Sequence, residues 1–154
     1  MKSVQDPAGQ DGHGGPMSRA FSVTRSVDRP VEDVWRQLTD WDRAAGWLGV
    51  DSIRADGPTR VGTTLRFVTR GKERTSEIAE LHPGRSITLR SQQGGVTADY
   101  RYTVEPSGAG SRVGLTADVR TRGAWALAGP MIRTAIRRTD AGQLDAFDRE
   151  LTGR

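Results

Sequence analysis

Tyr100 and Tyr102 are the residues of this sequence that most directly suggest chemistry. They are two positions apart in an alternating stretch, and side chains at that spacing on a strand point to the same face. A buried tyrosine hydroxyl needs a hydrogen-bond partner, which the carbonyl group of a ligand would provide. A tyrosine or arginine donor could also stabilise an enolate during an aldol cyclisation. The alternative is that both rings are core residues with their hydroxyls at the rim.

Arg25 is a further polar candidate because it shares the apolar face of a predicted strand over residues 20–27 with Phe21 and Val27. Such an arginine either lies inside a ligand cavity or extends past the end of the strand to reach water. Thr69 and Ser91 are hydroxyl candidates on other predicted strands.

Metal and nucleophile chemistry have few candidate residues. The chain has no Cys, and its His residues are His13, in a polar N-terminal stretch, and His82, in a predicted turn before Pro83. A metal site or a Ser-His-Asp arrangement needs several such groups to converge. The sequence therefore predicts no metal site and no cofactor.

The middle of the chain, residues 50–121, alternates apolar and polar residues between short turns. This pattern predicts an antiparallel sheet with one covered face and one wet face. Together with the first strand, the predicted strands are residues 20–27, 50–55, 63–70, 73–81, 86–92, 96–105 and 112–121.

Three helical segments are predicted to complete the fold. Two short ones begin at Pro30 and at Trp41, and a long one covers residues 124–151, roughly 40 Å at 1.5 Å per residue. We expect Gly129-Pro130 to kink the long helix or to separate a short helix before it, and Gly142 is a second weak point. Its stripe at helical spacing is apolar except at Asp140: Trp125, Ala128, Ile132, Ile136, Asp140, Leu144, Phe147 and Leu151.

Composition limits the other possibilities. Residues 1–19 are rich in Gly, Pro, Asp and Gln without periodicity, which predicts a disordered tail before a single domain over residues 20–154. No apolar run is long enough to span a bilayer, no secretory signal is evident, and Cys is absent, so we expect a cytoplasmic protein. The net charge is +4. Arg133, Arg137 and Arg138 form either a solvated helix face or a partner surface, and we expect no nucleic-acid ligand.

The chain resembles the START-like (SRPBCC) superfamily. The resemblance rests on the runs Asp28-Arg29-Pro30-Val31-Glu32-Asp33-Val34-Trp35 and Leu38-Thr39-Asp40-Trp41 with Trp47. The run Gly129-Pro130-Met131-Ile132-Arg133, continued by Ile136-Arg137-Arg138, resembles the polyketide cyclase/dehydrase branch. The resemblance implies an α+β helix-grip fold: a seven-stranded antiparallel sheet around a long C-terminal helix, with two short helices between strands 1 and 2.

Members of this superfamily hold an apolar ligand between helix and sheet, so the resemblance implies binding of a small hydrophobic molecule that is lipid-, sterol- or polyketide-like. The alternative is a cofactor-free polyketide cyclase, aromatase or dehydratase that acts in the same cavity. A third possibility is an interaction protein that uses the arginine flank. The matched motifs imply a scaffold and no catalytic set. The predicted ligand-binding residues are Arg25, Leu65, Phe67, Leu89, Tyr100, Tyr102, Leu115, Ala117, Trp125, Met131 and Ile132.

Overall fold

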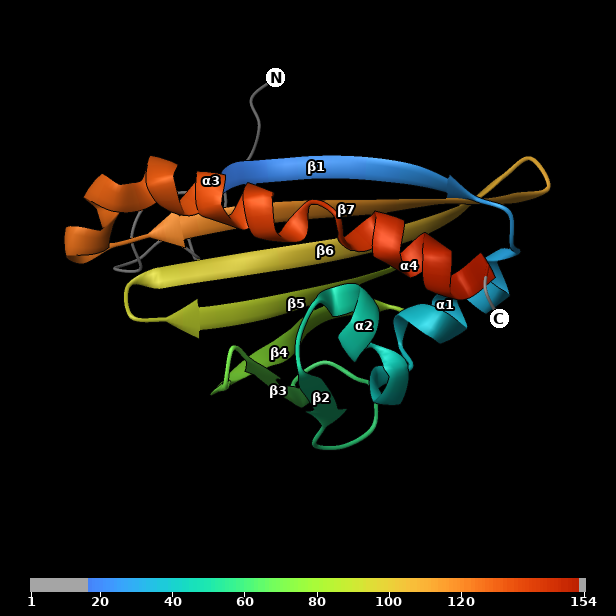
Figure 1. The fold of residues 1–154 in the computed structure, drawn as a ribbon, viewed down its shortest axis with the longest axis horizontal. Helices are drawn as coiled ribbons and strands as arrows, with labels where there is room; N and C mark the ends of the chain where they lie inside the picture. Colours follow the sequence, from blue (N-terminus) through green and yellow to red (C-terminus); the bar gives the residue numbers. More distant parts are fainter. Residues whose placement is uncertain (1–16, 153–154) are drawn as a thin grey trace, which may run out of the picture.

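A seven-stranded antiparallel sheet with helices on one face forms the body of the protein in the computed structural model, which describes residues 17–152 (Figure 1). The strands lie in the order β1-β7-β6-β5-β4-β3-β2. They are β1 Ser18–Val27, β2 Ser52–Ala55, β3 Thr64–Thr69, β4 Lys72–His82, β5 Ser86–Gln93, β6 Val96–Ser107 and β7 Gly110–Thr121.

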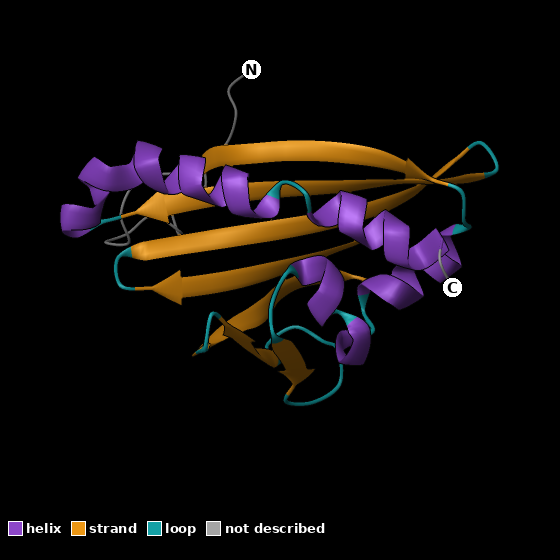
Figure 2. Cartoon of the chain, viewed as in Figure 1, coloured by secondary structure: helices purple, strands orange, loops and turns teal. Residues whose placement is uncertain are grey.

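The helices fall into two groups (Figure 2). Between β1 and β2 lie α1 Val31–Leu38, the short 3-10 helix η2 Trp41–Arg43, and α2 Ala45–Leu48. After β7 come η3 Gly123–Ala128, which is also a 3-10 helix, α3 Gly129–Asp140 and α4 Gln143–Thr152. This arrangement confirms the helix-grip fold that the sequence implies, with the C-terminal segment lying across the sheet.

The predicted alternation of the central strands is confirmed by their register. Tyr100 lies opposite Ala117, and Tyr102 lies opposite Leu115, in the antiparallel β6–β7 pair. Directly opposed residues share one face of the sheet, so these side chains all face the helices. A register shift between Ile78 and Glu80 in β4 marks a β-bulge, a feature that bends a strand.

The long helix is divided where the sequence has its weak points. A separate 3-10 helix precedes Gly129-Pro130, as predicted, and a second interruption at Ala141–Gly142 separates α3 from α4. The sequence predicts the second short helix over residues 41–45 with Gly46 as its end, whereas the structure has the 3-10 helix η2 and then a separate α2 that includes Gly46. That helix runs on to Leu48, and Gly49 ends it with φ +76°, a left-handed conformation that favours glycine because it has no Cβ.

Residues 1–16 and 153–154 lie outside the described part of the chain, and so does most of the predicted tail over residues 1–19. The first strand begins at Ser18, two residues before the predicted boundary at Ala20. None of the helices within residues 17–152 is long and apolar enough to cross a lipid bilayer.

Aromatic side chains fix α4 and α2 against the sheet. The ring of Trp47 packs edge-to-face on Phe147 of α4 and on Tyr102 of β6, with centroid distances of 5.0 and 5.7 Å. All three side chains are fully buried. Leu144 and Leu151 of α4 are buried beside them. This cluster is the closed end of the core, where helix and sheet are in direct contact.

Truncation of Phe147 tests this packing. We expect Phe147→Ala to lower the free energy of unfolding by about 3–5 kcal/mol, because it leaves a cavity between Trp47 and the sheet. The control is Leu127→Ala, at a leucine that is 92% exposed, which we expect to change stability by no more than about 0.5 kcal/mol. Chemical denaturation of both variants measures the difference. Equal losses in the two would contradict the assignment of α4 as the core-forming helix.

Candidate functional site

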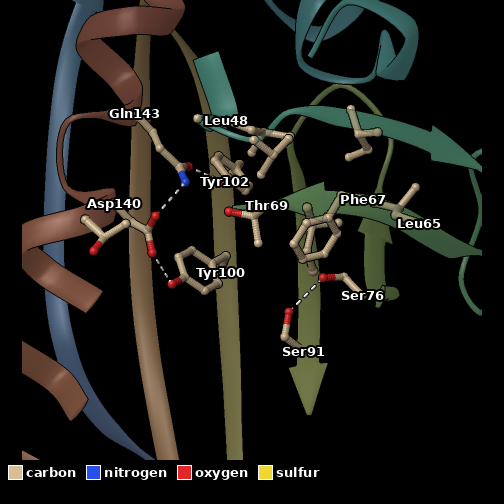
Figure 3. Close-up of a pocket in the computed structure, with 15 residues that line it drawn as sticks. Leu48, Leu65, Phe67, Thr69, Ser76, Ser91, Tyr100, Tyr102, Asp140 and Gln143 are labelled. Atoms are coloured by element: carbon tan, nitrogen blue, oxygen red, sulfur yellow. Dashed lines mark hydrogen bonds between the residues drawn. The ribbon is translucent and has the colours of Figure 1, made fainter. Parts of the chain in front are cut away.

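A cavity of about 250 Å³ lies beyond the aromatic cluster, between the sheet and the junction of α3 and α4 (Figure 3). Strands β2 to β6, the end of α2 and the helix junction all contribute to its wall. Its apolar residues are Leu48, Val50, Ile53, Leu65, Phe67 and Leu89, and the remaining lining residues are Gly49, Thr69, Ser76, Ser91, Tyr100, Tyr102, Thr139, Asp140 and Gln143.

Strand alternation positions the sheet side of this wall. Leu65, Phe67 and Thr69 are alternate residues of β3, so they share one face. On β5 and β6, Leu89 lies opposite Tyr100, which aligns an apolar side chain with a polar one. Leu65 and Phe67 of β3 give the cavity an apolar side, and Tyr100, Asp140 and Gln143 form a polar end at the helix junction, as Figure 3 shows.

The polar end of the cavity is a chain of hydrogen bonds between β6 and the helix junction (Figure 3). The hydroxyl of Tyr100 donates to Oδ2 of Asp140 over 2.5 Å, and the hydroxyl of Tyr102 donates to Oε1 of Gln143 over 2.6 Å. Nε2 of Gln143 donates to Oδ1 of Asp140 over 3.4 Å, a longer contact. Both carboxylate oxygens of Asp140 therefore accept a hydrogen bond.

Burial at the polar end of the cavity raises the pKa values of its acidic groups and so favours their protonated forms. Burial raises the pKa of Asp140, while the hydrogen bonds from Tyr100 and Gln143 oppose the rise. Burial also raises the pKa of Tyr100 and of Tyr102, and the charge of Asp140 adds to both shifts. The two phenols therefore stay neutral. Among the described residues, no Lys, Arg or His lines the cavity to compensate the carboxylate of Asp140.

A second polar group lies on the sheet, away from the helices. The hydroxyls of Ser76 on β4 and Ser91 on β5 are 2.7 Å apart and bond to each other. Figure 3 shows this pair below Phe67, with Thr69 between it and the polar end. These hydroxyls can donate to or accept from a ligand because either serine can supply the proton.

The structure brings five of the predicted ligand-binding residues together at this cavity, along with the hydroxyl candidates Thr69 and Ser91. The five are Leu65, Phe67, Leu89, Tyr100 and Tyr102. Leu115 and Ala117 do not line it. Both are fully buried on β7, on the same face but nearer the edge strand β1, where the core is closed.

Arg25 lies outside the cavity wall. Its Nε donates to Oδ2 of Asp148 over 2.8 Å, and it also pairs with Asp145, both on α4. Its exposed side chain agrees with the alternative in which the arginine reaches water, and the pairing with α4 is what the sequence does not predict. This pairing ties β1 to α4.

The three candidates from the helical segment lie elsewhere. Trp125 and Ile132 line a separate hollow beneath α3, and Met131 is 75% exposed. The indole of Trp125 lies close over Gly94 and Gly95, where a side chain would collide with it. Met131 immediately precedes Ile132, and successive residues of a helix are about 100° apart around its axis. Only Ile132 therefore faces the sheet.

Asp140 and Gln143 were not among the predicted site residues, although both belong to the polar end. The signal was present for Asp140, since it interrupts an otherwise apolar helical stripe. Gln143 is the first residue of α4, directly after the break at Ala141–Gly142. No sequence pattern marks Ser76, or Gly49 and Val50 between α2 and β2, as lining residues of the cavity. Within residues 17–152, no cluster of three or more His, Asp or Glu is arranged to hold a metal ion.

Comparison with known proteins gives a family and a fold. A family model described as "Polyketide cyclase / dehydrase and lipid transport" matches residues 18–152. Comparison with curated protein sequences gives no significant match.

Solved structures with the same fold have low sequence identity. The Zhui aromatase/cyclase from Streptomyces sp. R1128 is 21% identical with a TM-score of 0.70, over 90% of this chain and 96% of its own. Protein TTHA0849 from Thermus thermophilus is 19% identical with a TM-score of 0.69, over 90% and 98%. Norcoclaurine synthase from Thalictrum flavum, in complex with dopamine and hydroxybenzaldehyde, is 16% identical with a TM-score of 0.66, over 100% and 98%.

Replacement of Asp140 by Asn tests its electrostatic environment. Because its pKa is raised in the folded protein, the native state binds more protons than the unfolded state above about pH 4. The wild type should therefore lose stability, relative to Asp140→Asn, as the pH rises from that value through the raised pKa. Denaturation of both proteins between about pH 4 and pH 8 measures this. A difference that is independent of pH, or one that favours the wild type as the pH rises, would contradict the assignment.

Proposed function

Because the chain belongs to the polyketide cyclase/dehydrase and lipid-transport family of START-like proteins, we propose that its cavity binds a small, mainly apolar molecule with a neutral oxygen group. The observation that carries this proposal is the Tyr100–Asp140 pair at the end of an apolar cavity whose described wall contains no basic residue. The apolar body of the ligand would lie against Leu65, Phe67 and Leu89.

The polar end determines which oxygen groups are compatible. A protonated Asp140 can donate to a carbonyl or ether oxygen, and an ionised Asp140 can accept from a hydroxyl. A carboxylate or phosphate on the ligand would meet the charge of Asp140 without an offsetting cation among the described lining residues. The site should therefore select neutral ketones, phenols or alcohols over acids of the same shape.

The size of the cavity narrows the ligand class further. Its volume of about 250 Å³ lies below the roughly 300–1,000 Å³ usual for drug-sized ligands. A compact aromatic or short polyketide-like molecule fits this space better than a sterol or a two-chain lipid. The Ser76–Ser91 pair would bond a second hydroxyl or carbonyl at the opposite end of such a molecule.

The second candidate function is a cofactor-free cyclase or dehydratase, and the raised pKa of Asp140 favours it. A carboxyl group with a raised pKa can exchange protons near neutral pH more readily than an ordinary aspartate. Asp140 would remove a proton from the carbon next to a ketone and return it to the leaving oxygen. Tyr100 would orient the carboxyl through the hydrogen bond that its hydroxyl donates to Oδ2.

A series of probes that share one shape tests the binding proposal. We expect a naphthyl methyl ketone and a naphthol to bind, and the matching naphthoate to bind at least roughly tenfold more weakly at neutral pH. Asp140→Asn should reduce this discrimination because it removes the opposing charge. Asp145→Asn, on α4 outside the cavity, is the matched control and should keep it. Isothermal titration calorimetry measures the affinities. Equal affinity for acid and ketone in the wild type would refute the proposal.

Turnover separates the two candidate functions. If the protein is a cyclase, Tyr100→Phe and Asp140→Asn should lower kcat for a poly-β-carbonyl substrate by at least roughly a hundredfold, with a smaller change in KM. Leu127→Ala is the control variant, since this exposed residue is remote from the cavity wall. Wild-type rates in both site variants would remove the catalytic role and leave the binding function.

A further inference from the structure

The first turns of the C-terminal segment form a surface that the cavity does not explain. Leu127 is 92% exposed, Met131 75% and Trp125 49%, all in η3 and the start of α3. In Figure 1 this segment lies at the left end of the molecule, far from α1 and α2. We define the apolar patch as these three side chains together with the flanking Arg122 and Arg138.

Large exposed apolar side chains close together often mark an interaction site. The sheet-facing side of α3 is accounted for by Ile132 and Ile136, which pack on the core. Met131 and Arg138 are seven residues apart and share a different side of the helix, and both are exposed. Met131 and Arg138 therefore lie on the outward side of α3, whose inward side is already covered, and the half-exposed Trp125 borders them where it packs over Gly94 and Gly95.

Between Asp118 and Asp140, the charged side chains of the segment that carries the patch are all positive. Residues 119–139 contain five arginines and no acidic residue. None of the five takes part in the ion pairs found within residues 17–152, where the paired arginines are Arg19, Arg25, Arg36, Arg66, Arg90 and Arg112. Arg137 donates to the backbone oxygen of Ala20, a neutral group that leaves the positive charge of the guanidinium in place.

We propose that the apolar patch docks the protein on an anionic lipid bilayer. The combination of exposed Leu and Met, a half-exposed Trp and surrounding Arg is typical of segments that lie in the bilayer interface. The apolar side chains enter the acyl boundary, and the indole occupies the headgroup level. The arginines attract the anionic headgroups. An apolar protein partner would account for Leu127 and Met131 but not for the five arginines between Asp118 and Asp140.

The patch adjoins the ligand cavity through the hollow beneath α3. Trp125, Ile132 and Val96 line that hollow, and Ser91 lines both the hollow and the cavity. An apolar molecule could therefore pass from the bilayer along an apolar surface to the cavity. This last step rests on the proposed binding function, whereas docking itself does not depend on it.

Vesicle sedimentation tests the docking proposal with the full chain. The protein should co-sediment with phosphatidylcholine vesicles that contain about one-third phosphatidylserine, and much less with phosphatidylcholine alone. Raising the salt from about 0.1 M to about 0.5 M should weaken the binding. Leu127→Ser/Met131→Ser and Arg122→Gln/Arg138→Gln should each lower partitioning at least roughly tenfold.

Matched variants control for nonspecific effects. Val61→Ser removes an apolar residue that is 60% exposed elsewhere, and Arg43→Gln/Arg60→Gln removes two exposed charges outside the patch. Both should bind vesicles as the wild type does, and so should Tyr100→Phe, which separates docking from cavity function. Thermal denaturation shows that each variant is folded.

Three results would overturn the proposal. The first is that the patch variants bind vesicles as well as the wild type does. The second is absence of vesicle binding together with a dimer that Leu127→Ser/Met131→Ser disperses, which would assign the patch to self-association. The third is absence of vesicle binding together with DNA retention that Arg122→Gln/Arg138→Gln loses, which would assign the charge to nucleic acid.

Discussion

The C-terminal segment contacts the sheet in two different ways, and the cavity exists because of that difference. Along α4, Leu144, Phe147 and Leu151 are buried directly against the core. Along α3, Gly129 is the residue that is buried, and Ile132 and Ile136 are partly covered. The helix break at Ala141–Gly142 separates these two halves. Tight packing on one side of the break and looser contact on the other leave space at the junction.

Asp140 and Gln143 flank that break, and hydrogen bonds to Tyr100 and Tyr102 join them to β6. The same bonds that close the gap between helix and strand therefore place a carboxyl group at the wall of an apolar cavity. Burial raises the pKa of Asp140, and no basic residue within the described chain lines the cavity to lower it again. Asp140 accepts hydrogen bonds from Tyr100 of the strand and Gln143 of the helix. The same carboxyl group also determines which ligands the cavity can bind.

Most of the fold could be predicted from the sequence, because strand alternation and helical spacing are local patterns. Alternation predicts that Tyr100 and Tyr102 share one face of the sheet, and the structure has both on the face towards the helices. Arg25 could not be placed, since its partners Asp145 and Asp148 follow it by more than a hundred residues. Leu115 and Ala117 share the face of the tyrosines, but alternation does not tell a closed core from a cavity.

The predicted ligand-binding residues of the C-terminal helix, Trp125, Met131 and Ile132, show a second limit of prediction from sequence. The stripe that contains Trp125 and Ile132 fixes a helix face, but not where the helix departs from the sheet. Met131 lies off that stripe and is exposed, and Trp125 packs on Gly94 and Gly95 at the end of the molecule. Asp140 was visible as the one polar residue of the stripe. Its importance depends on contact with Tyr100, which is distant in the sequence.

The titration of Asp140 can be followed by NMR on the carboxyl carbon of protein with labelled aspartate, and it decides whether the cavity raises the pKa of this group. Asp140→Asn assigns the signal. Our account predicts a titration midpoint above the ordinary aspartate value of about 4, and a further rise when a neutral ketone fills the cavity and excludes water. A midpoint at or below that value, unchanged by the ketone, would contradict a cavity built around a partly buried carboxyl group with no cation beside it among the described residues.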